Sequence, residues 1–139
     1  MPERLRDLLL IFVGGGLGSV IRVMMDVPEL GPWMPANFLA CFLMGFSSAI
    51  VQQGVLPPSV LGWWKALMHT GFLGGLSTFS VLSIAGCMKY PENVFLAAWW
   101  LLVLLAGFFV FAVVGFLLGL GMKNLTGRVR NLLRFLFAE

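Results

Sequence analysis

Glycine and hydroxyl residues crowd one stretch of an otherwise apolar chain, GFLGGLSTFSVLS at residues 71–83. A glycine inside a helix costs about 1 kcal/mol relative to alanine, so the paired glycines predict a helix that breaks here. At such a break, freed carbonyl groups can hold a cation, whereas hydroxyls and a new helix N-terminus favour an anion. The stretch therefore predicts a site that handles ions.

Further polar residues interrupt the apolar segments, among them Arg22, Asn37 and His69. Polar groups inside a membrane are costly, which makes them default candidates for function. Each also has a structural interpretation. Arg22 can reach lipid headgroups, and Asn37 can cap the helix that follows Pro35. His69 has no second histidine or acidic residue nearby in the chain, which favours a structural role for it.

Patterns for catalysis or metal binding do not occur in the sequence. Cys41 and Cys87 form no CxxC motif, so they predict neither a metal site nor a disulfide framework. The few acidic residues lie in loops or near the termini, and they form no carboxylate pair or nucleophile–base pair. We therefore predict that the protein is not an enzyme.

Composition places the chain in a membrane. Of its 139 residues, 60% are hydrophobic and only 11% are charged, and the mean hydropathy is +0.97. A soluble domain of this size could not bury so much apolar surface. The sequence pI near 9.3 reflects basic residues that flank the helices, so nucleic-acid binding is not predicted.

The hydropathy pattern predicts an all-α membrane protein with four transmembrane helices and a break in the third. Each span needs roughly 20 apolar residues, so one domain covering residues 1–139 accommodates all four. A basic amphipathic tail follows them and is expected to lie on the cytoplasmic face. The expected helices are 8–25, 36–51, 60–88 and 94–122, and the expected tail is 123–139.

Basic residues set the expected orientation in the cell inner (plasma) membrane. With four spans, both termini lie on one side. Seven basic residues share that side: Arg4, Arg6, Lys65, Lys123, Arg128, Arg130 and Arg134. Only Arg22 and Lys89 lie opposite. Because basic loops stay inside, both termini are predicted to be cytoplasmic.

Glycines with a spacing of four residues predict close contacts between helices. The pairs are Gly14 with Gly18, Gly71 with Gly75, and Gly115 with Gly119. Ordinary packing explains such pairs, and only the middle pair adjoins the expected break.

Three motifs resemble the Fluc/CrcB family of small fluoride ion channels. They are GGGLGSVIR in the first span, NFLACFLMG in the second and GFLGGLSTFS in the third. Together with the four-span layout, the resemblance covers nearly the whole chain. The third motif is the specific one, and the chain is identified as a divergent member.

The resemblance implies an antiparallel dimer in which the third helices cross at their breaks. It implies a structural Na⁺ held by the backbone carbonyls of Gly74 and Ser77, and passive fluoride export through pores beside the interface. The pore-lining positions that it implies are Asn37, Phe79, Ser80, Arg22, Thr78 and Leu82. The edge of a phenylalanine ring carries positive quadrupole character, which suits a small anion in a narrow pore.

Departures from the family pattern raise the question of a partner. Leu82 stands where a second phenylalanine is usual, Trp33 replaces a threonine, and Ala40 replaces a glycine. The fourth span, residues 94–122, carries no hydroxyl or amide side chain. The strong charge bias also favours a single orientation. These features favour a heterodimer with a homologous, oppositely oriented subunit, and an antiparallel homodimer stays open.

Two other functions stay open. One is a divergent family member that has lost fluoride conduction and moves another solute, and the other is a structural subunit of a larger assembly. A small multidrug transporter is disfavoured because residues 8–21 contain no acidic side chain.

Overall fold

The structure is a computed structural model. It describes the backbone of residues 3–25, 27, 33–54, 56 and 58–137, and the side chains of residues 3–25, 27, 33–54, 56 and 60–122. The helices in chain order are α1 (Glu3–Met24), α2 (Trp33–Gln52), α3 (Pro58–Trp64), the π-helix η1 (Lys65–Leu73), α4 (Gly74–Leu76), α5 (Phe79–Lys89) and α6 (Val94–Phe137). No strand occurs in the described part of the chain.

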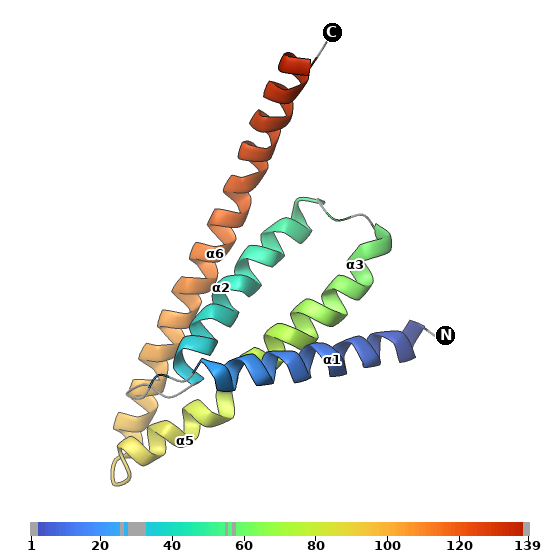
Figure 1. The fold of residues 1–139 in the computed structure, drawn as a ribbon. Helices are drawn as coiled ribbons and strands as arrows, with labels where there is room; N and C mark the ends of the chain where they lie inside the picture. The colour runs from blue at the N-terminus through green and yellow to red at the C-terminus, as the bar shows by residue number, and fades with distance from the viewer. Residues whose placement is uncertain (1–2, 26, 28–32, 55, 57, 138–139) are drawn as a thin grey trace.

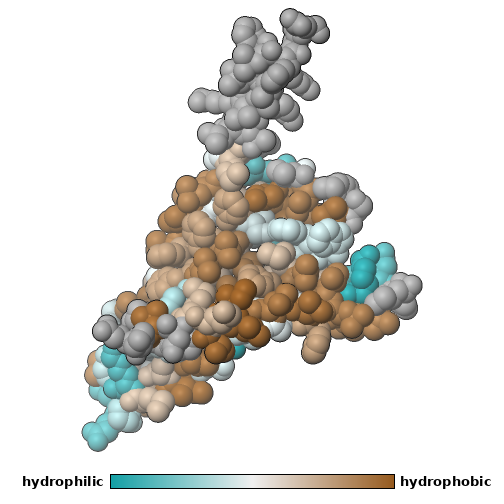
Figure 2. All heavy atoms as spheres, in the orientation of Figure 1, coloured by the Kyte–Doolittle hydropathy of each residue, from teal (hydrophilic) through white to brown (hydrophobic). Residues whose placement is uncertain are grey.

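Four helical segments are long and apolar enough to cross a membrane: Glu3–Met24, Trp33–Gln52, Val60–Lys89 and Val94–Met122. In hydrocarbon each backbone N–H and C=O needs a partner within the protein, and a helix supplies these partners within one segment. Figure 2 shows apolar side chains over most of the visible face, with hydrophilic ones gathered near the N-terminus and at the turn between α5 and α6. The predicted all-α, four-span membrane fold is confirmed.

The third span is a composite of four helical pieces. A π-helical turn replaces α-helix over Lys65–Leu73, and a short α-helical piece ends at Leu76. Ser77 and Thr78 are extended, with φ/ψ of −85°/152° and −151°/120°. The predicted break therefore lies at Ser77 and Thr78, one residue after the paired glycines.

The ends of the other spans differ modestly from the predicted ones. The first helix begins at Glu3, because its charged first turn continues the apolar helix without a breaker. The fourth continues unbroken to Phe137, so the backbone of most of the tail belongs to α6. The amphipathic face predicted for residues 123–139 lies outside the described side chains.

The helices pack as two close pairs. α6 lies along α2, and α1 lies across the third span at η1 and α4 (Figure 1). Glycines make both contacts possible, as their spacing predicts. A Cβ on Gly14 or Gly18 would strike the backbone of the third span, and a Cβ on Gly115 would strike the Phe42 carbonyl of α2.

A small core joins the two pairs. Ala36 and Ala40 of α2 pack on Leu73 and Leu76 of the third span, and all four are buried. Alanine on α2 lets the third span approach closely directly before its break.

Candidate functional site

The break releases backbone groups that an unbroken helix would pair. In an α-helix the N–H of Thr78 would donate to the carbonyl of Gly74. It donates instead to Asn37 Oδ1 at 2.7 Å. The Gly74 carbonyl is thereby freed from the helical pattern, next to the extended pair of residues.

Asn37 holds the break from α2. Its side chain is 4% exposed, and its Nδ2 donates to the carbonyl of Thr78 at 3.2 Å and to that of Trp33 at 2.7 Å. Together with the bond to Oδ1, the amide pairs with both backbone polar groups of Thr78, as a neighbouring strand would. Both amide hydrogens are engaged, so Asn37 fixes the extended backbone at membrane depth.

Two side chains of α1 donate to neighbouring carbonyl groups of the third span. Ser19 Oγ donates to the carbonyl of Gly75 at 3.4 Å, and Arg22 Nη1 donates to that of Ser77 at 3.5 Å. The break therefore draws partners from both α1 and α2.

The outer side of the break carries exposed polar and aromatic side chains. Phe79, the first residue of α5, is 59% exposed, and Ser80 is also exposed. Thr78 Oγ1 and Ser80 Oγ lie 3.2 Å apart. No side chain caps the N-terminus of α5. Unpaired N–H groups and the helix dipole there favour a negative charge.

The structure gathers most of the sequence-predicted site residues around the break. Thr78, Phe79 and Ser80 form its outer side, and Asn37 lies beneath it. Arg22 approaches from α1. Leu82 differs, because it is 2% exposed and packs inward on the first turns of α5.

Sequence reasoning missed Ser19, which is the only hydroxyl side chain of α1. Its place directly after Gly18 in GGGLGSVIR was an available signal. A small cavity of about 140 Å³ behind the break was also missed. It is lined by Ala40, Cys41, Met44, Leu73, Ser77 and Ala112.

The predicted cation ligands are two backbone carbonyl oxygens, those of Gly74 and Ser77. Carbonyl oxygens of an unwound segment are typical Na⁺ ligands, and that of Gly74 is free of the helical pattern. A Cβ at Gly74 would meet only the His69 carbonyl, at 3.9 Å, so the space beside it is open. One chain supplies two such oxygens, and that of Ser77 also accepts from Arg22.

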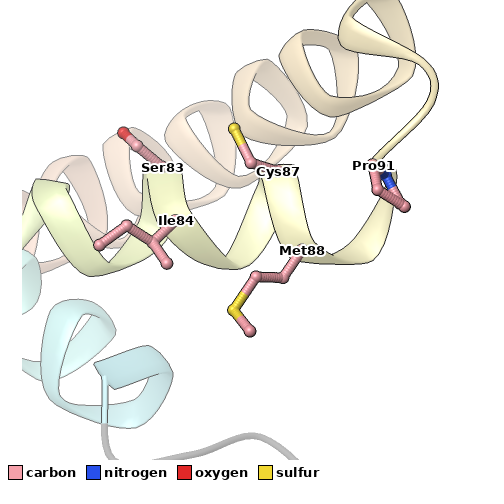
Figure 3. A pocket seen from close by; sticks show the side chains of 5 residues that line it. All are labelled: Ser83, Ile84, Cys87, Met88 and Pro91. Carbon is pink, nitrogen blue, oxygen red and sulfur yellow. The ribbon is translucent and has the colours of Figure 1, made fainter.

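An apolar groove of about 450 Å³ runs along α5 away from the break (Figure 3). Its lining residues are Ser83, Ile84, Cys87, Met88 and Pro91. The Ser83 hydroxyl donates to the carbonyl of Phe79, one turn earlier on α5, at 3.2 Å. Because this hydroxyl already has a partner, Ser83 adds no free polar group to the groove.

Comparison with known proteins identifies the family. The family described as CrcB-like protein, Camphor Resistance (CrcB), matches residues 9–121. The chain belongs to the CrcB family. A relative from Serratia proteamaculans (strain 568), named Fluoride-specific ion channel FluC, is 36% identical, and the match covers 82% of this chain and 94% of that protein. A relative from Yersinia pseudotuberculosis serotype I (strain IP32953), named Fluoride-specific ion channel FluC 3, is 31% identical, with 81% and 87% covered.

The CrcB match spans all four membrane helices, and the break falls well inside it. The site described above is thus part of the region that the family shares. The polar links of Asn37 and Arg22 to the break also lie within it.

Replacing Asn37 with alanine is expected to destabilise this CrcB fold. It would leave the N–H and C=O of Thr78 without partners, at about 1–3 kcal/mol for each buried group. Asn37→Asp keeps an acceptor for the N–H but places a carboxylate oxygen against the carbonyls of Thr78 and Trp33, so it is expected to destabilise the fold as well. Thermal unfolding of purified protein in detergent measures both. Equal Tm values for Asn37→Ala and the wild type would show that Asn37 does not hold the break.

Proposed function

We propose that this chain is a subunit of a passive, fluoride-selective ion channel. The observation that carries the proposal is the break, which presents an uncapped helix N-terminus and an exposed phenylalanine at membrane depth. Fluoride is the proposed anion because the chain belongs to the CrcB family and its relatives are named fluoride-specific ion channels. Conduction is electrodiffusion, so no chemical step and no enzymatic activity are part of the proposal.

Each residue of the break has a part in moving an anion. The Phe79 ring offers a positive edge, and the hydroxyls of Thr78 and Ser80 offer donors that replace water. Arg22 raises the local anion concentration by its charge. Asn37 holds the extended backbone of the pathway in place through Thr78, and Leu82, which packs inward, supports the first turns of α5.

A structural Na⁺ belongs to the same proposal. The carbonyls of Gly74 and Ser77 would hold it, and two equivalent oxygens from a second subunit would complete its coordination. The ion would supply positive charge that stabilises two facing breaks.

A second subunit is proposed because the break is uncovered. Irregular backbone at membrane depth must be buried in protein or face water, yet Gly74, Phe79 and Ser80 are exposed in the single chain. An antiparallel partner would cover them. The charge bias and the apolar fourth span favour a homologous subunit of opposite orientation over a second copy.

The proposed location is the plasma membrane with both termini in the cytoplasm. The seven-to-two distribution of basic residues supports this orientation. Lipid surrounds the outward faces of α1 and α6, whose exposed side chains are mainly apolar.

The test is fluoride efflux from lipid vesicles that contain only this protein. A potassium gradient with valinomycin drives the flux, a fluoride electrode follows it, and chloride efflux is the control. Fluoride-selective efflux supports a channel and excludes an obligatory partner. Efflux that appears only after addition of an oppositely oriented homologue supports the heterodimer. No efflux in either case, from folded protein, contradicts the function.

A second candidate is transport of another solute on the same scaffold. The inward-packed Leu82 and the hydroxyl-free span at residues 94–122 favour it, because a fluoride pathway needs polar groups along its length. Efflux of chloride or larger ions in the same vesicles would support it. A purely structural subunit would move none of these solutes.

A further inference from the structure

A second polar link joins the third span to α2, away from the break. It consists of Trp64, Ser47 and His69, and we call it the clasp. The indole Nε1 of Trp64 donates to Ser47 Oγ at 3.1 Å, and Ser47 Oγ lies 2.8 Å from His69 Nε2. Ser47 is buried on α2, in the half of that helix opposite Asn37.

The π-helix makes the clasp possible. In a regular α-helix, residues five apart point about 140° away from each other, so Trp64 and His69 could not both face Ser47. A π-helix bonds residue i to residue i+5 and therefore stacks such residues on one face. η1 begins at Lys65, directly after Trp64, and contains His69. π-Helical segments are frequent at functional sites.

In one protonation state the Ser47 hydroxyl both accepts and donates within the clasp. An indole nitrogen can only donate, so Ser47 Oγ accepts from Trp64. The hydroxyl proton is then available to His69 Nε2, which accepts only when the imidazole is neutral with its proton on Nδ1. The clasp is complete in this state.

Charges near the clasp oppose protonation of His69. Lys65 lies one turn earlier on the same helix, and α2 carries no charged residue over Trp33–Gln52. On α1, Arg6 approaches Gly62 of the third span, and its ion partner is Asp7 at 3.0 Å. A positive charge at His69 would lie near that of Lys65, and Ser47 Oγ would then accept from both Trp64 and His69, which leaves the hydroxyl proton without a partner in the clasp.

The clasp and Asn37 fix the third span at two points. Ten residues separate Asn37 and Ser47 on α2, which is about 15 Å along the helix. Leu73 and Leu76 fill the core between these points. Movement of the third span at the clasp would therefore shift the break relative to Asn37.

We propose that His69 is a positioning residue, which in its neutral form holds the third span on α2 through Ser47 and releases it when protonated. Because the held state excludes the added proton, acid favours the released state. The break then loses its alignment with Asn37, and conduction falls. The effect on conduction rests on the proposed function. The hold through Ser47 and its release on protonation do not.

The test uses the fact that His69 is the only histidine of the chain. Selective ¹⁵N-histidine labelling in lipid nanodiscs reports the tautomer directly. We expect a neutral ring with the proton on Nδ1 at neutral pH, and a hydrogen-bond shift on Nε2 that Ser47→Ala removes. A neutral ring with its proton on Nε2, or no response to Ser47→Ala, would overturn the proposal whatever the protein conducts.

Two pH profiles complete the test. Between about pH 7.5 and 5.5 an ordinary imidazole becomes mostly protonated, and we expect wild-type flux to fall by about fivefold and the Tm to fall with it. In His69→Gln, a side-chain carbonyl can accept from Ser47 at either pH, so both profiles should be flat. Ser48→Ala, at the neighbouring position, should keep the wild-type profiles. Protein-free vesicles correct for leakage of hydrogen fluoride.

The outcomes separate the two proposals. If the chain conducts nothing, the channel function fails, and the tautomer and the Tm profile still decide the role of His69. If wild type and His69→Gln share the same pH dependence of Tm, the positioning role is overturned, whether or not fluoride moves.

Discussion

Replacement of Phe79 with isoleucine is expected to lower fluoride flux by about 100-fold, which corresponds to roughly 2.7 kcal/mol added to the barrier. Isoleucine keeps the apolar character of the side chain but offers no ring edge to an anion that has lost part of its water. Phe79 is more than half exposed and begins α5, so its ring is free to face a pathway at the break. Vesicle efflux measures the effect.

The matched control is Phe12→Ile on α1. Phe12 is 79% exposed and lies on the opposite face of α1 from Gly14, which contacts the third span. Its replacement should leave the flux unchanged. Full flux through Phe79→Ile, with an unchanged Tm, would show that the anion pathway lies elsewhere in the molecule.

Gly18→Val is expected to prevent α1 from packing on the third span. A Cβ at Gly18 would strike the carbonyl of Phe72 and would lie 2.8 Å from the backbone nitrogen of Leu76. Backbone atoms cannot move aside as a flexible side chain can. Overpacking usually costs about 1–3 kcal/mol, and we expect at least the upper value here. Loss of monodisperse protein in gel filtration and a lowered Tm measure the effect.

Gly16→Val provides the comparison on the same helix. Nothing lies within 4 Å of a Cβ at Gly16, so this variant carries the same change in helix propensity without the clash. The difference between the two variants isolates the contact. Equal stability of both would show that the close approach at Gly18 does not hold α1 in place.

Hydropathy predicted the spans well because lipid leaves the backbone few alternatives to a helix. The break was also predictable, since Gly74 and Gly75 weaken the helix shortly before two residues with hydroxyl side chains. The glycine spacing indicated close packing but not the partners. That Gly18 meets the third span while Gly115 meets α2 depends on contacts between distant parts of the chain.

Other features of the site left no local signal. The pairing of Asn37 with Thr78 joins residues 41 positions apart, and only the folded chain brings them together. Hydropathy does not distinguish an α-helix from the π-helix that turns Trp64 and His69 to one face. The inward packing of Leu82 follows from the direction in which α5 leaves the extended pair, which sequence position alone does not fix.

The pairing of the helices has a consequence for how the protein is made. The first helix pairs with the third and the second with the fourth, so no helix finds its main partner in the next one to leave the ribosome. Until the third and fourth spans are inserted, the amide of Asn37 and the exposed backbone at Gly45 on α2 face lipid or another protein. Neither pair can close until a later span has entered the membrane. Synthesis of this chain therefore passes through a stage in which the amide of Asn37 is already inserted while its partner Thr78 is not yet translated.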